Sequence, residues 1–352
     1  MKHKLLFLLP WLAAASVFPQ PDPAFCPCFA DSVRSRTLRV CFYNMENFFD
    51  YADDSLTNDG DFTPSGAYHW NASRYYHKAD QIGKVLVAAG GWEPPDIIGL
   101  AELENESVIR TLLYHTALKK WKYRYVHFDS PDPRGVDVAL LYRPDRFECI
   151  CSEAVPVSFS KSPESRTRDI LYVCGKAAGS DDTVHFFVCH FTSRYSGYKA
   201  TVSKRCTTAS ILRERAEAIR TGDPEACVLM MGDFNDTPSD SSMRHYLGAR
   251  LDTLHPDDGF VNLMYPFVRK NSVGTHKFHR DWSVLDQFVV TPCMLRTDAP
   301  YRVASPACIF AAAFMLADDE KYLGQKPFRT FVGRRYKGGF SDHLPIVLDL
   351  AY

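Results

Sequence analysis

Three carboxylates lie directly beside apolar runs of this 352-residue chain, where an unpaired charge would be costly to bury. Glu102 and Asp233 each follow an apolar segment, and Asp342 precedes the last one. Asn44 and Glu46, at the end of the first apolar segment, extend this set. Oxygen ligands of this kind suit Mg²⁺, with Mn²⁺ or Ca²⁺ as alternatives, better than they suit zinc. We therefore predict a site for a hard divalent cation, with Mg²⁺ as the expected ion.

The apolar segments that must position these residues read as buried strands that alternate with helices. The predicted strands are Leu38–Tyr43, Asp96–Leu100, Val136–Tyr142, Val184–His190, Cys227–Gly232, Val284–Val290 and Pro345–Leu350. The predicted helices are Asn71–Ala89, Glu106–Lys119 and Gly197–Arg220. Asn71 is the expected N-cap of the first helix, which the pair Gly90-Gly91 should end.

Polar residues recur at the ends of these strands. Asn44, Glu102, His190 and Asp233 come where a strand ends, and His343 lies just before the last strand. Strand ends at one edge of a sheet can converge in space although they are far apart in sequence, and a rigid scaffold presents a site in this way. The pattern predicts one shared site.

Composition and charge are those of an ordinary globular protein, with 46% hydrophobic and 24% charged residues. We find no internal repeat or low-complexity segment, and we favour a single domain. The formal net charge of −1 excludes a protein that is held on nucleic acid by bulk charge alone. The chain has 11 cysteines, an odd number that cannot all pair within one chain, so the disulfide pattern stays open.

The N-terminus has the order of a secretory signal peptide. Lys2 and Lys4 precede a largely apolar stretch, Leu5–Phe18, that includes three consecutive alanines. The stretch is short for a membrane span, which needs about 20 apolar residues, and Pro10 interrupts it. We predict a leader over residues 1–20, export to the periplasm or the exterior, and no membrane span once the leader is removed.

Four segments, taken in order, form a recognisable pattern. Tyr43-Asn44-Met45-Glu46-Asn47, Leu100-Ala101-Glu102, Gly232-Asp233-Phe234-Asn235 and Ser341-Asp342-His343 resemble the signatures of the endonuclease/exonuclease/phosphatase superfamily. That group includes pancreatic-type deoxyribonucleases, apurinic endonucleases, inositol polyphosphate phosphatases and neutral sphingomyelinases. The resemblance implies one catalytic domain over residues 36–352. It also implies a four-layered, two-sheet α/β sandwich of the deoxyribonuclease-like type, with its site at one edge of the sheets.

The resemblance further implies metal ligands. Glu102 looks like the principal metal carboxylate, with Asn44, Asp342 and Glu46 near it. The metal would be Mg²⁺, and it would place positive charge on the non-bridging oxygens of a phosphodiester during hydrolysis.

Five other residues match positions that carry the reaction in the superfamily. Asp233 and Asn235 look like the groups that position the attacking water and hold the transition-state oxygens. His343 resembles the catalytic histidine, with Asp286 as its orienting carboxylate, because a carboxylate on Nδ1–H stabilises the imidazolium. His190 resembles the second active-site histidine of the deoxyribonuclease-like branch. Either Asp233 or His343 could act as the general base.

Two further residues extend this set. Asp137 is the only charged residue inside Val136–Tyr142, and by resemblance we predict that it pairs with His190 as a second dyad. The alternative is an edge-strand aspartate that faces water. Arg168 matches an arginine that contacts substrate phosphate in the deoxyribonuclease branch, and a solvated loop arginine is the alternative.

Two basic and aromatic stretches suggest a nucleic-acid substrate. Lys326–Lys337, which includes Arg329 as a phosphate contact, could bind backbone phosphates and stack bases. The segment from His276 to Trp282 could line the other side of a cleft. Both could instead be solvated loops. We predict an exported nuclease that acts on DNA or RNA, without a stable protein partner.

Two other functions stay open. A phosphatase or a sphingomyelinase-like lipid phosphodiesterase would use the same chemistry, and the apolar run Ala307–Leu316 is the only candidate for a membrane-docking surface. A buried helix explains that run equally well. A catalytically inactive binding module is also possible, since fold does not determine function, but such a module would be expected to lack metal-site or histidine residues that this chain retains.

Overall fold

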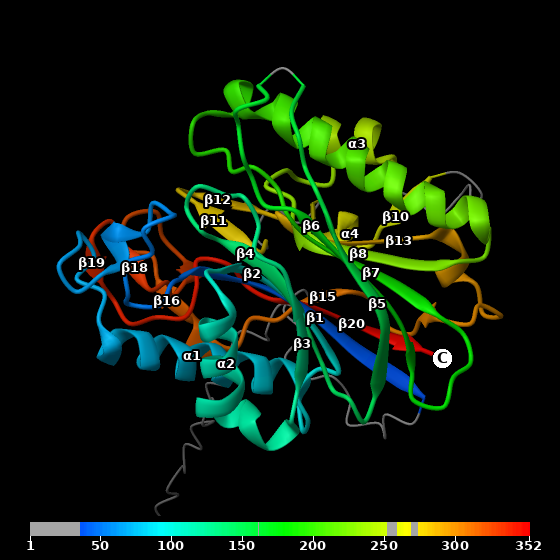
Figure 1. The fold of residues 1–352 in the computed structure, drawn as a ribbon, viewed down its shortest axis with the longest axis horizontal. Coiled ribbons are helices and arrows are strands. Elements are labelled where there is room, and N and C mark those ends of the chain that lie inside the picture. Colours follow the sequence, from blue (N-terminus) through cyan, green and yellow to red (C-terminus); the bar gives the residue numbers. More distant parts are fainter. Residues whose placement is uncertain (1–35, 161, 252–258, 269–273) are drawn as a thin grey trace, which may run out of the picture.

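The computed structural model describes residues 36–160, 162–251, 259–268 and 274–352. Two mixed β-sheets pack face to face, and helices cover both outer faces (Figure 1). This arrangement is the two-sheet α/β sandwich that the sequence predicted. The predicted leader, residues 1–20, lies outside the described residues.

The first sheet has the strand order β14-β20-β1-β2-β4-β3, and β15 also pairs with β20. Strands β1 and β2 are parallel, and the other pairs are antiparallel. The strands are β1 (Thr37–Phe48), β2 (Ile97–Leu103), β3 (Arg124–His127), β4 (Asp137–Tyr142), β14 (Arg302–Val303), β15 (Cys308–Ile309) and β20 (Ile346–Ala351).

The second sheet has the order β5-β6-β7-β8-β13-β10-β9, in which β7 and β8 run parallel and β13 runs antiparallel to β8. Its strands are β5 (Phe147–Val155), β6 (Ile170–Ala177), β7 (Val184–His190), β8 (Cys227–Asp233), β9 (Ala249–Arg250), β10 (Phe260–Asn262) and β13 (Asp286–Val290). The helices are α1 (Ala72–Gly90), α2 (Glu106–His115), α3 (Tyr198–Gly222) and the short α4 (Tyr265–Val268).

Three short hairpins lie outside the two sheets: β11 (His276–Phe278) with β12 (Asp281–Ser283), β16 (Leu316–Asp318) with β17 (Gln325–Pro327), and β18 (Phe331–Val332) with β19 (Arg335–Tyr336). In the first of them, His276 forms an isolated β-bridge with His343. This bridge brings β11 to the residue that precedes β20.

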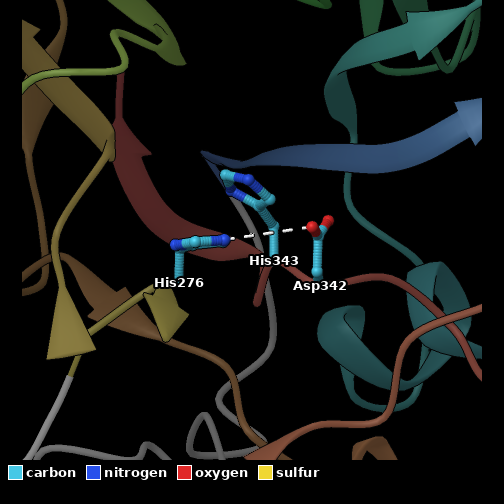
Figure 2. Close-up of side chains that lie close together, drawn as sticks. All are labelled: His276, Asp342 and His343. Carbon is cyan, nitrogen blue, oxygen red and sulfur yellow. Dashed lines mark ion pairs between the residues drawn. The ribbon is translucent and has the colours of Figure 1, made fainter. Parts of the chain in front are cut away.

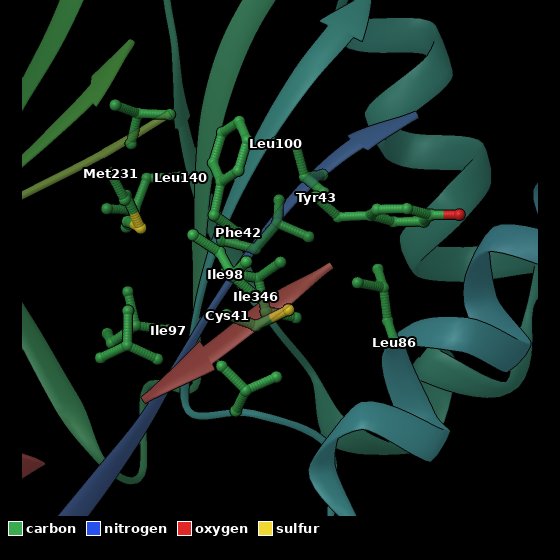
Figure 3. Close-up of a cluster of buried hydrophobic side chains, with 14 of the residues drawn as sticks. Cys41, Phe42, Tyr43, Leu86, Ile97, Ile98, Leu100, Leu140, Met231 and Ile346 are labelled. Carbon is green, nitrogen blue, oxygen red and sulfur yellow. The ribbon is translucent and has the colours of Figure 1, made fainter. Parts of the chain in front are cut away.

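The main core fills the space between the two sheets and continues under α1. Figure 3 shows Phe42 on β1, Leu100 on β2 and Met231 on β8, all fully buried, together with Leu86 of α1. A Cβ on Gly99 would lie 2.9 Å from Met231 Sδ, so a glycine is needed where the sheets approach. The central strands are buried on both faces, which explains why they read as continuous apolar runs.

A second core lies between the outer face of the second sheet and α3. Ala209, Leu212 and Ala216 of α3 pack against Val228 and Met230 of β8. These helix residues recur at helical spacing, as the sequence indicated. The helix thereby fixes the strand that ends in Asp233.

The predicted boundaries of the first helix are nearly correct. Asn71 caps α1, and its side chain accepts a hydrogen bond of 3.2 Å from the Arg74 amide. The second helix is shorter than predicted, because Thr116 ends α2 and begins a separate 3₁₀ turn over Ala117–Trp121. In that turn the Thr116 hydroxyl accepts from the Leu118 amide, which breaks the α-helical pattern.

The run Ala307–Leu316 forms neither the docking hairpin nor the helix considered above. Cys308 and Ile309 form β15 against β20, and residues Ala313–Met315 form a 3₁₀ turn. The side chains of Ile309 and Met315 are buried in the main core. Among the described residues, none of the helices has the length and apolar character that a membrane span requires.

Candidate active site

The second sheet aligns three of the predicted catalytic residues in one row. His190 ends β7 opposite Asp233 at the end of β8, and Asp233 lies opposite Asp286 at the start of β13. All three are at least 96% buried, with exposed fractions of 4%, 1% and 0%. The predicted convergence of strand ends is therefore present in the structure.

The first sheet adds Asn44 and Glu102 from the ends of the parallel strands β1 and β2. Asn44 Nδ2 donates to Asp233 Oδ2 over 3.1 Å, and this bond joins the two sheets. The register is irregular after Asn44 and around Glu102, whose φ is +62°. A left-handed backbone conformation costs energy at a non-glycine residue, and residues in this conformation are concentrated at functional sites. Here it turns the Glu102 side chain to the edge of the sheet.

His343 and Asp286 form the predicted pair. His343 Nδ1 lies 2.7 Å from Asp286 Oδ2, and its Nε2 lies 3.8 Å from Asp233 Oδ2. Burial alone would lower the pKa of His343, but Asp286 and Asp233 raise it well above its usual value. Burial raises the pKa of Asp233 to about 7, although His343 opposes this shift. An imidazole and a carboxylate with mutually shifted pKa values are groups of the kind that general acid–base chemistry uses.

Asn235 holds the same aspartate from the other side. Its backbone N–H donates to Asp233 Oδ1 over 2.9 Å, and its side-chain Nδ2 lies 3.2 Å from Asp233 Oδ2. Asn235 also has a left-handed backbone, with φ +49°. Asp233 is thus held by two asparagine side chains, in the position that the sequence predicted for it.

His190 lies on the opposite side of Asp233 from His343. Its Nε2 is 3.7 Å from Asp233 Oδ2 and 3.6 Å from Glu102 Oε1. Burial and the neighbouring Arg168 hold the pKa of His190 well below its usual value, which keeps the ring neutral. The pKa values of the two histidines beside this carboxylate are thus shifted in opposite directions, and such a separation is typical of acid and base pairs.

A hard divalent cation fits the chemistry of the Glu102 carboxylate. Oε2 accepts a hydrogen bond from the Asn47 amide over 2.7 Å, whereas within the described ranges no donor bonds to Oε1. The side chain is 16% exposed, so an ion can reach it. Mg²⁺ typically takes one or two protein carboxylates and keeps several waters. Glu102 would hold the ion, with the Asn44 side chain and Asp342 as further oxygen groups at this edge.

The structure places Glu46 in a different role from the predicted one. Glu46 Oε1 accepts from Arg329 Nε over 2.9 Å, and Oε2 accepts from the Thr330 amide over 2.7 Å. Arg329 Nη2 also lies 2.9 Å from Asp342 Oδ2. With both oxygens occupied and 4% exposure, Glu46 is a buried partner of Arg329 and not an open metal ligand.

The hairpin residue His276 adds a group to the site that the sequence placed only in a substrate-binding rim. Figure 2 shows its ring directed at Asp342, with Nε2 3.9 Å from Oδ2, and next to the His343 ring at a centroid distance of 4.8 Å. Burial and His343 lower the pKa of His276 to about 4. No spacing within the sequence predicts this contact, because it depends on the bridge between β11 and the segment before β20.

The predicted dyad of Asp137 and His190 is wrong. Asp137 is buried, but its carboxylate accepts hydrogen bonds of 3.0 Å from His127 Nε2 and from the Ser130 amide. In the described residues His190 Nδ1 has no hydrogen-bond partner. Asp137 instead fixes the loop between β3 and β4, which the sequence could not show because His127 lies on a strand that was not predicted.

Arg168 is also structural where a phosphate contact was predicted. Its guanidinium donates to the carbonyl oxygens of His190 (3.2 Å) and Phe191 (2.6 Å) and to Asp132 (2.7 Å). The residue is 5% exposed. Arg168 therefore holds the chain at His190 in place, and each of its three nitrogens donates to a protein oxygen.

We expect Arg168→Lys to lower the free energy of unfolding by about 2 kcal/mol, because lysine keeps the charge beside Asp132 but loses the planar set of hydrogen bonds. Urea unfolding would measure this change. The matched control is Arg134→Lys, since Arg134 contacts the same Asp132 from a side chain that is 44% exposed. If Arg168→Lys left the stability unchanged but raised KM, the result would support the predicted phosphate contact instead.

The stretch Lys326–Lys337 is less open than predicted. Phe331 is buried, Phe328 packs against the core, and Tyr336 lies under the Arg74 guanidinium. Lys326 pairs with Asp319. Its exposed residues are 332–335, at the tip of the β18–β19 hairpin, and Lys337.

The tip of the β11–β12 hairpin, in contrast, is exposed. Phe278 is 65% exposed and stacks on the exposed His279, with ring centroids 4.1 Å apart and an angle of 27°. Arg280 next to them is exposed as well. Lys277 is not available, because Asp319 binds it at 2.9 Å. An aromatic and cationic tip thus lies two residues from His276.

Comparison with solved structures agrees with this fold. An endonuclease/exonuclease/phosphatase family protein from Bacteroides thetaiotaomicron has a TM-score of 0.54 and 17% identity, covering 89% of this chain and 97% of its own. The mannosyl-6-phosphatase of the same species has a TM-score of 0.53 and 16% identity, covering 90% and 100%. The catalytic domain of human nocturnin has a TM-score of 0.51 and 16% identity, covering 90% and 94%.

No curated protein sequence matches the chain significantly. The sequence profile described as the endonuclease/exonuclease/phosphatase family does match it, over residues 39–352. This match spans both sheets and every residue of the site described above. The chain therefore belongs to the endonuclease/exonuclease/phosphatase family, whose members are hydrolases that act on phosphoester bonds.

Proposed function

We propose that this protein is a Mg²⁺-dependent phosphodiesterase that cleaves nucleic acid, DNA or RNA. The observation that carries the proposal is the buried row of His190, Asp233 and Asp286, joined to His343, beside the open oxygen of Glu102. This set supplies a base, an acid and a cation ligand within one strand-end cluster. Phosphodiester hydrolysis needs these functions.

The roles follow from the contacts of each residue. Asp286 fixes the His343 ring through Nδ1, so Nε2 faces Asp233 and the open edge. A charged His343 would stabilise the developing charge of the phosphoryl group or protonate the leaving oxygen. Asp233, held by Asn44 and Asn235, would align or deprotonate the attacking water. The divalent ion would stabilise charge on the non-bridging oxygens.

The substrate class rests on the exposed tip of the β11–β12 hairpin. Stacked Phe278 and His279 offer a flat surface to an unpaired base, and Arg280 offers charge to a backbone phosphate. Arg329, with 40% of its side chain exposed beside Asp342, would be a second phosphate contact. This combination of a stacking surface and positive charge favours a nucleic-acid substrate.

We also propose that the protein is exported. The support is the sequence of the predicted leader, with lysines before a short apolar stretch. A nuclease outside the cytoplasm would act on nucleic acid in the surroundings of the cell.

The test is hydrolysis of plasmid DNA, single-stranded RNA, sphingomyelin, an inositol polyphosphate and a sugar 6-phosphate by the mature protein. We expect cleavage of nucleic acid with Mg²⁺ and none with EDTA. Glu102→Gln should raise the Mg²⁺ concentration needed for half-maximal rate about tenfold or more, because it removes one charge from the ion.

The matched control is Glu214→Gln, an exposed change on α3 that leaves the site intact. Turnover confined to the sugar, inositol or lipid substrate would keep the chemistry and reject the nuclease. If Mg²⁺ dependence were the same in Glu102→Gln and Glu214→Gln, the assignment of the ion to Glu102 would be wrong.

A further inference from the structure

A lysine of α1 is buried behind the active site. Lys78 is 1% exposed and lies among the buried apolar residues of this helix, such as Ile82 and Val85. Lysine is rarely buried unless its ammonium group is paired, because it is costly to remove the charge from water. Burial lowers the pKa of Lys78 to about 8, although the carboxylates of Glu46 and Asp342 oppose this shift. The polar end of this side chain therefore lies close to acidic groups of the site.

The ammonium group binds two segments that are distant from the helix in the sequence. Lys78 Nζ donates to Thr330 Oγ1 over 2.5 Å and to the Phe340 carbonyl oxygen over 2.6 Å. Thr330 directly follows Arg329, and Phe340 is three residues before His343. Lys78 thus joins the segment that presents Arg329 to the segment that presents His343.

From Thr330, a chain of contacts leads to the guanidinium of Arg329. The Thr330 amide donates to Glu46 Oε2 over 2.7 Å, and Arg329 Nε donates to Glu46 Oε1 over 2.9 Å. Arg329 Nη2 in turn lies 2.9 Å from Asp342 Oδ2. Because Lys78 holds the Thr330 side chain, it fixes the residue next to Arg329.

From Phe340, a second chain of contacts leads to the catalytic histidine. Ser341 is the next residue, and its Oγ donates to the Asn44 carbonyl oxygen over 2.7 Å and accepts from the His343 amide over 3.0 Å. The His343 ring then meets Asp286 at 2.7 Å. A shift of the Phe340 carbonyl group would therefore displace the imidazole.

We propose that Lys78 is a positioning residue for phosphoester hydrolysis, which fixes Arg329 and His343 relative to each other through Thr330 and Phe340. Since Lys78 is buried, it acts through the groups that it holds and not on the substrate. The inference rests on the proposed roles of Arg329 and His343, and it is independent of whether the substrate is nucleic acid. Displacement of reacting groups by about 1 Å can lower a rate by about 100-fold.

The experiment compares Lys78→Met with wild type by amide hydrogen exchange and by hydrolysis of bis-p-nitrophenyl phosphate. Methionine is unbranched and adaptable in a core, but it has no donor for Thr330 or Phe340. The matched control is Lys119→Met, the same change at an exposed lysine of the turn over Ala117–Trp121. Exchange in peptides that cover residues 326–343, measured by mass spectrometry, reports on both held segments without any turnover.

In Lys78→Met we expect these amides to exchange about tenfold faster or more, because the variant loses two hydrogen bonds that hold the segments. We expect kcat to fall about 100-fold and KM to change much less, since the loss concerns the alignment of reacting groups. Lys119→Met should match wild type in both measurements.

Thr330→Val is a second variant, which keeps the size of the side chain and removes only the hydroxyl group. The bond from Lys78 to the Phe340 carbonyl oxygen remains, so its loss of kcat should be smaller than that of Lys78→Met. The double variant should lose little more than Lys78→Met alone, because the two residues act through one contact.

Two results would overturn the proposal. Unchanged exchange and unchanged kcat in Lys78→Met would show that Lys78 does not hold the two segments. A lower Tm with unchanged kcat would make Lys78 a stabilising residue alone. Failure of the proposed function is a separate result: if wild type cleaved no phosphodiester, faster exchange confined to residues 326–343 would still support the role of Lys78 in holding the site.

Discussion

Replacing His343 with alanine is expected to lower kcat/KM by about 10³- to 10⁴-fold, the contribution typical of a positioned acid or base. The imidazole lies between the Asp286 and Asp233 carboxylates, at 2.7 Å and 3.8 Å. Alanine removes the charge that faces the phosphoryl group and leaves Asp286 without its partner. The rates of wild type and variant with saturating Mg²⁺ would measure the effect.

Variants of Asp286, the hydrogen-bond partner of His343, test the same prediction. Asp286→Asn should lower kcat strongly with little change in KM, since it alters the tautomer and charge of His343 without touching the substrate. The double variant His343→Ala, Asp286→Asn should lose little more than His343→Ala alone, because residues that act as one unit are not additive. The control His245→Ala removes an exposed histidine from the turn over Ser242–Leu247. Independent losses in the double variant would contradict the pairing.

The catalytic row was predictable because its members end buried strands. The apolar runs before His190 and Asp233 are visible in the sequence, and parallel register then places the two residues side by side. The four short signature segments supplied the roles, which no spacing could have shown. The pairing of His343 with Asp286 followed from the same resemblance and is present at 2.7 Å.

The wrong predictions concern the partners of buried charged side chains. Glu46, Asp137 and Arg168 were each placed near the right edge, but the sequence does not reveal which partner a buried charge will find. Glu46 meets Arg329, which is 283 positions away, and Arg168 meets Asp132. A buried charge must be paired, yet its partner is determined by the packing of loops whose conformation has no periodic signal.

Strands β5 and β6 of the second sheet were missed for a related reason. Most residues of β5 are at least partly exposed, so its pattern lacks the apolar run that marked the central strands. Strand β6 contains Gly175, which is required because a Cβ there would lie 2.2 Å from the Glu148 carbonyl oxygen. A glycine inside a strand weakens the sequence signal although the packing demands it.

The second large effect is expected at a buried ion pair behind the catalytic loop. Arg205 of α3 and Asp236 are both 0% exposed, and Arg205 Nε lies 2.9 Å from Asp236 Oδ2. Asp236 follows Asn235, and its backbone oxygen accepts from Gln287 on β13. We expect Asp236→Ala to lower the free energy of unfolding by about 3–5 kcal/mol, because Arg205 keeps its charge in a buried position without a counterion.

The two sides of this pair are not equivalent, and this asymmetry provides the test. Without Arg205, Asp236 still accepts hydrogen bonds of 2.5 Å from Arg194 and 2.6 Å from Ser242, so Arg205→Met should cost less than Asp236→Ala. Without Asp236, the contacts left to Arg205 among the described residues are the oxygens of Thr192 and Thr201 and the Tyr198 ring, all of them neutral. The double variant should therefore be more stable than Asp236→Ala alone, since it removes the stranded charge. Urea unfolding of the three variants would measure this order of stabilities. If the double variant is the least stable, the loss of stability in Asp236→Ala comes from lost packing in the loop and not from an unpaired guanidinium.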